Sequence, residues 1–370
     1  MIDSGHQADL LGEAVKVLEK QYEENKDFNS FFDEEGPLYL GEYEYERSRT
    51  LFWLDREAYE NERRVWEDNS YQELHKEIID LISNSGLVAP FQDLLAAVER
   101  GRVVPFVGAG MSRPMGMPLW AEALEKLVER IPGADKVKIL KLIEEGHYLY
   151  AAQYLYECDA VQVKNFIRTA YRRNKLNPSE SMRLLPRIGN GCVITTNFDD
   201  AIEQTYHLEG MEFRAYMHGT QEHNFFPRLA RGERCLLKLH GDADDPATHI
   251  LTQEQYAEAY GSPFDFKKPL PKALRQVFIS QSLLFLGCSL EQDWTLELLE
   301  NSIATEEYVV PNHYAIIPEV VNAQEKAIKE TRLLALNIQP LWYPTDRHEY
   351  VERYLKLLVD AAEKRVSFAG

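Results

Sequence analysis

Short apolar runs, each ending in glycine or polar residues, recur along the larger, C-terminal part of this chain. We expect strands at 103–107, 192–195, 235–239, 283–287, 313–317 and about 338–343. Segments with apolar residues at helical spacing alternate with the later strands, at 252–260, 271–281, 294–303, 321–332 and 347–363. Because strands that alternate with helices form parallel sheets through right-handed crossovers, this pattern predicts a doubly wound α/β fold.

The first two predicted strands are separated by a long segment of different character. Residues 119–187 have apolar positions at helical spacing throughout, for example at Leu124, Leu127 and Val128. We therefore expect an all-helical small subdomain inserted at about this position in the α/β domain.

Residues 1–88 form a separate segment whose apolar residues again follow helical spacing. Its middle part, 28–71, is crowded with acidic and aromatic residues, and disordered segments are poor in aromatics. The polar stretch 83–86 is typical of a boundary. We therefore divide the chain into a helical N-terminal extension, 1–88, and a main domain, 89–370. The aromatic residues either pack the extension on the main domain or form an interface with another chain.

The composition narrows the class of protein. With 41 basic and 60 acidic residues the formal charge is −19, which disfavours nonspecific nucleic-acid binding by the whole surface. The four cysteines are sparse, so we expect reduced thiols in a cytoplasmic protein. No run approaches about 18 apolar residues, and the N-terminus lacks the pattern of a secretory signal, so we expect neither a membrane span nor export.

A turn with two glycines follows the first strand of the main domain and reads Gly108-Ala109-Gly110-Met111-Ser112. A strand, glycines and a helix in this order are typical of a phosphate cradle, because glycine lets the backbone approach a pyrophosphate and a helix N-terminus offers free N–H groups. A turn that only reverses the chain is the alternative. Arg113 stands where the dehydrogenase fingerprint has its third glycine, so hydride transfer is disfavoured.

Three later strands also end in residues with chemical function. The second strand runs into Thr195-Thr196-Asn197-Phe198-Asp199, the third into Lys238-Leu239-His240-Gly241-Asp242, and the fourth into Gly287-Cys288-Ser289. Parallel strands place their carboxyl ends at one edge of a sheet, where open α/β sheets bind ligands. The four strand ends together therefore predict a ligand site.

These motifs and their order resemble the sirtuin superfamily, and more narrowly the sirtuin-like NADase domains of bacterial anti-phage defence systems. The resemblance covers roughly residues 90–350. Its weaker features are Leu251-Thr252, Tyr256, Asp293 and His313-Tyr314-Ala315-Ile316. It implies a Rossmann-like sheet of the sirtuin type, with NAD as the substrate. It also implies that Asn197 lies beside the nicotinamide ribose and that His240 is the catalytic base.

Two departures from the sirtuin deacylases are informative. Those enzymes carry a zinc ribbon of two Cys-x-x-Cys pairs, whereas this chain has no such pair, so we expect no zinc. Its cysteines are Cys158, Cys192, Cys235 and Cys288. An Asp-Phe-Arg segment that follows the glycine loop in the deacylases is replaced here by Leu119-Trp120. Both differences argue against peptide deacylation, and neither argues against dinucleotide binding.

We assign catalysis to Asn197 and His240. The carboxamide of Asn197 can orient a water or the ribose, and a histidine can take a proton from a ribose hydroxyl near neutral pH. The alternatives are a helix N-cap for Asn197 and a structural role for His240. Nucleotide contacts are expected at Gly108, Ala109, Gly110, Ser112, Thr196, Asp199, Gly287, Cys288 and Ser289. Ser112 and Asp199 have an equally simple interpretation as turn or helix caps.

The leading hypothesis is an NAD⁺ glycohydrolase that releases nicotinamide and ADP-ribose through an oxocarbenium-like centre and so depletes NAD⁺ in anti-phage defence. The chain has no Gly-x-Ser-x-Gly or His-Glu-x-x-His motif to support a serine or metal hydrolase. Three alternatives stay open: a sensor or scaffold that binds an NAD-derived nucleotide without turnover, an NAD-dependent deacylase, and a nuclease component of a defence complex.

Control of such an activity is expected, because a free NAD⁺ hydrolase would poison its own cell. The resemblance implies a homo-oligomer and, in some relatives, a HerA-type ATPase as partner. The chain contains no Gly-x-x-x-x-Gly-Lys-Ser/Thr loop, so an ATPase would be a separate protein. The segment 28–71 is the candidate surface, since an acidic aromatic patch suits a protein interface better than nucleic acid.

Overall fold

The computed structural model describes residues 4–172, 175–189, 191–221, 224–291, 294–304 and 310–368. Contacts between residues divide the chain into two compact units. One comprises the residues up to 77 together with those from 364, and the other comprises residues 78–363. The division falls inside one long helix, α4 (Arg56–Asn84).

The smaller unit consists of helices and one short hairpin. Its elements are α1 (Ser4–Glu24), α2 (Lys26–Asp33), β1 (Leu38–Leu40), β2 (Tyr43–Tyr45), α3 (Arg47–Leu54) and the first part of α4. The antiparallel hairpin, in which Leu38 pairs with Tyr45, differs from the helical expectation. Its turn contains Gly41 at a φ of +69°, a conformation that glycine adopts at little cost.

The smaller unit has a buried and an exposed set of aromatic residues, besides part-buried ones such as Phe32 and Trp66. Tyr22, Phe28, Phe52 and Tyr59 are buried against one another, with edge-to-face contacts such as that of Phe52 and Tyr59, whose ring centroids are 5.0 Å apart. The second set is exposed and comprises Phe31, Tyr39, Tyr43, Tyr45 and Trp53. The unit therefore has an aromatic core of its own and an aromatic surface in addition.

The larger unit is built on a parallel sheet, which has seven strands in the described part of the chain. The strands are β3 (Val103–Val107), β4 (Cys192–Thr195), β5 (Ala215–His218), β6 (Cys235–Lys238), β7 (Ser282–Leu286), β8 (His313–Pro318) and β9 (Ile338–Tyr343). Their spatial order is β5-β6-β4-β3-β7-β8-β9, and every neighbouring pair is parallel. The predicted doubly wound α/β fold is confirmed, and each of the predicted strands lies within one residue of its expected bounds.

β5 is the strand that the sequence pattern does not predict. It lies at one edge of the sheet, and its residues are mostly part-exposed rather than an apolar run. The central strands β3 and β7, in contrast, are buried along their whole length. Strands buried on both faces have continuous apolar sequences, whereas an edge strand does not need one.

The strand order places a topological switch point at β3. From β3 the chain continues to β4 on one side and later returns to β7 on the other side. The carboxyl ends of these three strands therefore lie next to one another, and ligands of open α/β sheets bind at such a point. The glycine loop and the loops that carry Asn197 and Gly287 follow directly after these ends.

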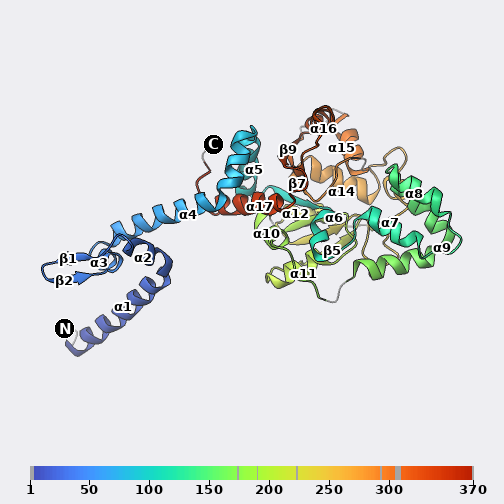
Figure 1. Ribbon diagram of the computed structural model, residues 1–370. Helices are drawn as coiled ribbons and strands as arrows, with labels where there is room; N and C mark the ends of the chain where they lie inside the picture. Colours follow the sequence, from blue (N-terminus) through green and yellow to red (C-terminus); the bar gives the residue numbers. More distant parts are fainter. Residues whose placement is uncertain are drawn as a thin grey trace. The chain divides into compact units, whose positions relative to one another are not determined.

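Helices flank the sheet and fill the insertion between β3 and β4 (Figure 1). In chain order they are α5 (Val88–Glu99), α6 (Ala109–Ser112), the 3₁₀ turn η1 (Arg113–Met115), α7 (Trp120–Val128), α8 (Lys136–Glu144), α9 (Tyr148–Tyr171), α10 (Glu180–Ile188), α11 (Ala201–Leu208), α12 (Phe225–Ala230), α13 (Gln253–Tyr260), α14 (Pro269–Phe278), α15 (Trp294–Ala304), α16 (Ala323–Ala335) and α17 (Glu349–Ala362).

The insertion at about 119–187 contains helices and no strand in its described residues, in agreement with the sequence pattern. Within it, α7, α8 and α9 pack against one another. The last helix, α10, packs instead against α17 and β3, and so belongs to the layer that covers the sheet. Among the helices that the structure describes, none combines the length and the apolar character needed to cross a membrane.

Candidate functional site

The glycine loop after β3 packs directly on the loop after β7. The N–H of Gly108 donates to the carbonyl of Leu286 at 2.8 Å, and the N–H of Gly110 donates to the carbonyl of Gly287 at 3.0 Å. A Cβ atom on Gly108 would lie 2.5 Å from the Gly287 oxygen, and one on Gly110 would lie 2.9 Å from the Gly287 Cα atom. The close approach of two protein loops therefore requires both glycines, which is a reason that the sequence alone did not reveal.

Asn197, just past the end of β4, joins its loop to the glycine loop. Its Nδ2 atom donates to the carbonyl of Gly108 and to the hydroxyl of Ser112, both at 3.1 Å, and its N–H donates to Thr195 Oγ1 at 3.0 Å. Helix α11 begins only after Asp200, so Asn197 is not the N-cap that was its alternative. The carboxamide oxygen has no hydrogen-bond partner among the described residues and remains able to accept one.

Ser112 and Asp199 are engaged with each other. The buried Ser112 hydroxyl donates to Asp199 Oδ1 at 3.1 Å, and the same oxygen accepts the N–H of Ala201 at 3.1 Å. Burial raises the pKa of Asp199, while Lys238 and these hydrogen bonds oppose the rise. Asp199, one residue before the N-cap Asp200, therefore binds the first N–H of α11, and Ser112 links Asp199 to Asn197.

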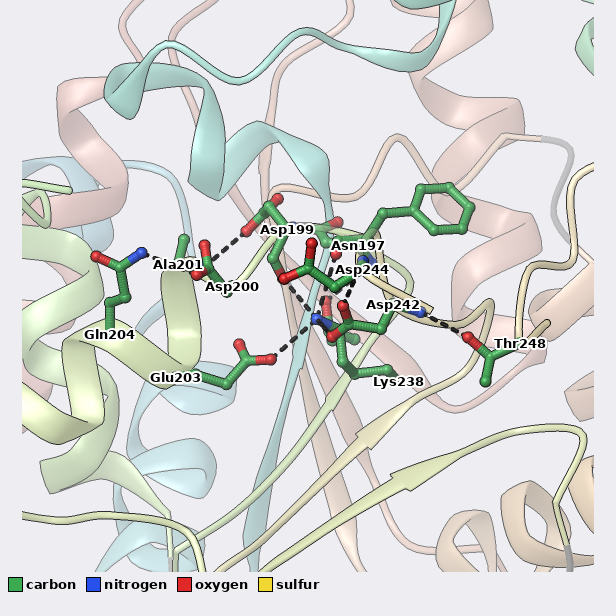
Figure 2. A network of polar contacts seen from close by, with 12 residues as sticks. Asn197, Asp199, Asp200, Ala201, Glu203, Gln204, Lys238, Asp242, Asp244 and Thr248 are labelled. Carbon is green, nitrogen blue, oxygen red and sulfur yellow. Dashed lines mark hydrogen bonds and ion pairs between the residues drawn. The ribbon is translucent and has the colours of Figure 1, made fainter. Parts of the chain in front are cut away.

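Lys238, the last residue of β6, is the centre of a buried ionic network. Its Nζ atom lies 2.7 Å from Asp242 Oδ2 and 2.9 Å from Glu203 Oε1, and it also donates to the carbonyls of Phe198 and Asp199. Figure 2 shows the two carboxylates converging on this amine from different elements. Burial alone lowers the pKa of Lys238, but the two carboxylates outweigh it and the pKa is raised, so the amine stays charged.

The network holds the loop after β4 against the loop after β6. The first of these loops carries Asn197 and the second carries His240, so Lys238 positions both predicted catalytic residues without being one of them. Sequence reasoning did not single out Lys238. Its signal was a lysine within an otherwise apolar run, Leu236-Leu237-Lys238-Leu239, where a charge must find a buried partner.

His240 follows β6, and each of its ring nitrogens meets a tyrosine hydroxyl. Nδ1 lies 3.1 Å from the Tyr256 oxygen and Nε2 lies 3.2 Å from the Tyr260 oxygen. The side chain is buried, and burial lowers the pKa of His240 to about 3. The imidazole is therefore neutral at pH 7 and able to accept a proton.

The low pKa does not by itself mark a functional histidine. His313, at the start of β8, is buried and also has a pKa of about 3 for the same reason. Its Nδ1 atom accepts the N–H of Leu283 at 3.1 Å within the sheet, as expected of a structural residue. What distinguishes His240 is its place at the carboxyl end of the sheet, two residues after Lys238 and next to the loop that carries Asn197.

Aromatic side chains surround His240. Tyr256 and Tyr260, one turn apart on α13, stack with their ring centroids 5.7 Å apart, and Trp294 lies against both at 5.8 and 5.6 Å. Tyr256 was a weak feature of the resemblance, whereas Tyr260 and Trp294 were not predicted to be near the site. The spacing of Tyr256 and Tyr260 on one face of a helix was visible in the sequence, but their contact with His240 was not.

The other expected nucleotide contacts lie around these loops. The N–H of Thr196 donates to the Val107 carbonyl at 3.3 Å, the Cys288 sulfur borders Gly108, and the exposed Ser289 follows it. Ala109 begins the four-residue helix α6. In the described residues no hydrogen bond joins the Asn197 and His240 side chains, and no group of acidic, histidine or cysteine side chains is arranged to hold a metal ion. Asp293 lies outside the described residues.

The region that carries this site is similar to known proteins. Residues 191–341 match the profile of the SIR2-like domain. The chain is 27% identical over 226 residues to "NAD(+) hydrolase ThsA" of Bacillus cereus (strain MSX-D12), which covers 61% of this chain and 45% of that protein. It is 23% identical over 311 residues to "Defense-associated sirtuin 2" of Bacillus subtilis, covering 81% of this chain and 29% of that protein.

The chain thus spans less than half the length of the curated relatives it matches. A solved Sir2 enzyme chain is also similar, with a TM-score of 0.38 at 13% identity, over 74% of this chain and 98% of that one. The matches to the SIR2-like model and to the curated relatives confirm the resemblance to sirtuin-like defence proteins that the motifs indicated. Residues 191–341, which include Asn197 and His240, are therefore similar to a SIR2-like domain.

Proposed function

We propose that this chain hydrolyses NAD⁺ to nicotinamide and ADP-ribose. The observation that carries the proposal is the placement of Asn197 and His240 after the adjacent strands β4 and β6, beside the glycine loop of β3 at the switch point of the sheet. The similarity to proteins named NAD(+) hydrolase, at 26–28% identity, supports the same activity.

The chemistry needs a held ribose, an oriented water and a proton acceptor. Asn197 is fixed through its amide nitrogen, which leaves its oxygen to accept a hydrogen bond from the ribose or from the attacking water. His240 is the proton acceptor. A hydroxyl or water that approaches an oxocarbenium-like carbon becomes strongly acidic as the bond forms, so even an imidazole with a pKa of about 3 can take its proton.

We assign the nucleotide contacts to the loops around this pair. The N–H groups of Gly108 and Gly110 already bind the loop after β7, and the Ser112 hydroxyl already binds Asp199 and Asn197. We therefore assign the phosphate contact of the glycine loop to the N–H of Ala109, at the start of α6. The loop after β7, with Cys288 and Ser289, would border the rest of the nucleotide. These contacts follow from their position at the carboxyl edge of the sheet.

The activity is tested by incubating the purified protein with NAD⁺ and separating the products by chromatography. We expect slow but measurable release of nicotinamide and ADP-ribose from the wild type, because the activity is latent, and release at least about 100-fold slower from Asn197→Ala or His240→Ala. His313→Ala is the matched control, since it also removes a buried neutral imidazole, but from the opposite edge of the sheet. Binding of NAD⁺ without products would favour a nucleotide sensor, and products only with an acylated peptide would favour a deacylase.

We further propose that the activity serves anti-phage defence in the cytoplasm and stays latent until copies of the chain, or a partner such as a HerA-type ATPase, assemble on it. The exposed tyrosines Tyr43 and Tyr45, which share one face of the β1–β2 hairpin, are the candidate contact surface, because aromatic residues are enriched in interfaces. Light scattering of the double variant Tyr43→Glu, Tyr45→Glu should give a smaller particle than the wild type. A monomeric, fully active wild type would contradict the latency.

A further inference from the structure

The two tyrosine hydroxyls leave no ring nitrogen of His240 free. Tyr256 faces Nδ1 at 3.1 Å and Tyr260 faces Nε2 at 3.2 Å. A neutral imidazole has one donor and one acceptor nitrogen, and a phenol hydroxyl can serve either. Both hydrogen bonds are therefore satisfied at once, and a ligand hydroxyl has no direct place on the ring.

The two tyrosines differ in their access to solvent. Tyr260 is fully buried, with no exposed surface, whereas Tyr256 is part-exposed. Tyr256 is also held in place: it stacks on Tyr260 and contacts Trp294, and its helix α13 begins with a capping box formed by Thr252 and Gln255. Tyr256 thus presents a fixed hydroxyl to the buried imidazole from a side chain that is itself part-exposed.

We propose that Tyr256 relays a proton from the attacking water to His240. The attacking water gives a proton to the Tyr256 oxygen, while the Tyr256 hydroxyl proton passes to Nδ1 of His240. The water oxygen uses the electron pair of the broken O–H bond to bond to the ribose carbon, and the bond from that carbon to nicotinamide breaks, so nicotinamide leaves with the electron pair of that bond. The tyrosine ends neutral as it began, and the histidine gains one proton. Tyr260 is the positioning residue, since it fixes the ring through Nε2.

This inference rests on the proposed NAD⁺ hydrolysis and makes a distinct claim about it. If the relay is correct, the hydroxyl of Tyr256 is as necessary as the imidazole of His240, and the two act as one unit. General base catalysis contributes about 10²–10⁴-fold, so Tyr256→Phe should lower kcat by a factor in that range. The aromatic contacts should persist, because phenylalanine keeps the ring and loses only the oxygen.

The test is a double-mutant cycle on kcat for NAD⁺ hydrolysis. We expect Tyr256→Phe and His240→Ala to lower kcat to a similar extent. The double variant should be no slower than either, because the effects of two substitutions on one proton path are not additive. Tyr260→Phe should reduce kcat less. Tyr354→Phe is the matched control, since it removes a fully buried tyrosine hydroxyl that donates to the Trp342 carbonyl at 3.0 Å.

Several outcomes would overturn the relay. Tyr256→Phe with kcat within about threefold of the wild type, or faster than the wild type, would mean that the substrate displaces the tyrosine and reaches His240 directly. Additive losses in the double variant would mean that the two residues act independently. In both cases the wild type hydrolyses NAD⁺ and the proposed function stands, whereas a wild type that never forms nicotinamide overturns the function and the relay together.

Discussion

Replacement of Lys238 by methionine would leave the Glu203 and Asp242 carboxylates without their counter-ion in the centre of the site. Methionine keeps the length and apolar stem of the side chain, so the change removes the charge and little volume. The Lys238 side chain is 1% exposed, and its carboxylate partners are 16% and 25% exposed. Removing one partner of a buried ion pair costs about 3–5 kcal/mol, because the remaining charge is buried and unpaired.

Two lost hydrogen bonds lower the free energy of unfolding of Lys238→Met further. The carbonyls of Phe198 and Asp199 each lose the hydrogen bond that they accept from the Lys238 amine. The Phe198 carbonyl keeps one bond, from the N–H of Ala243 at 2.9 Å, which limits the loss. We therefore expect the free energy of unfolding of Lys238→Met to fall by about 3–5 kcal/mol. NAD⁺ hydrolysis should fall as well, since the loops of Asn197 and His240 lose their common anchor.

Urea unfolding followed by circular dichroism measures this change. Lys136→Met is the control, because Lys136 and Glu129 also form a short pair, at 2.6 Å, but with side chains 50% and 66% exposed. Removing an exposed pair costs at most about 1 kcal/mol. If the free energy of unfolding of Lys238→Met also falls by less than about 1 kcal/mol, the reasoning is refuted. The desolvation of the amine would then offset its attraction to the two carboxylates.

Two other predictions concern the loops and the buried histidines. Gly108→Ala should destabilise the protein by about 1–3 kcal/mol, because its Cβ atom would lie 2.5 Å from the Gly287 oxygen. Gly12→Ala in α1, where no atom lies within 4 Å of the added Cβ, should instead be neutral or stabilising by about 0.5–1 kcal/mol, and equal thermal shifts for the two would contradict the packing role of Gly108. The pKa of His313 is about 3 in the folded chain and about 6.5 when unfolded, so its contribution to stability is complete above about pH 6.5 and declines toward pH 3 by about 1.4 kcal/mol per pH unit. The unfolding free energies of the wild type and His313→Asn should therefore converge as the pH is lowered from 7 to 5, and parallel profiles would show that His313 is not buried as a neutral ring.

The architecture of the larger unit could be predicted from the sequence because each strand carries its own local signal. The strands β3, β4, β6 and β7 are buried on both faces, so each is a continuous apolar run that ends in glycine or polar residues. The rule that ligands bind at the carboxyl ends of parallel strands then indicated the loops that carry Asn197 and His240, and the resemblance to sirtuins gave these two residues their roles. The edge strand β5 and the hairpin at 38–45 escaped prediction, because part-exposed strands carry no such run.

The sequence by itself thus determined the strands, the parallel sheet and the two residues that we assign to catalysis. Only the tertiary structure decided what surrounds them, because those contacts join residues that are far apart in the chain. Asn197 meets Gly108 across 89 positions, Lys238 meets Glu203 across 35, and His240 meets Tyr256 across 16. Hydrophobic periodicity records which face of each element is buried and carries no information on which buried polar groups meet. That choice depends on the order of strands in the sheet and on the paths of the loops between them, and it is what makes Lys238 an anchor and Tyr256 the proposed route to His240.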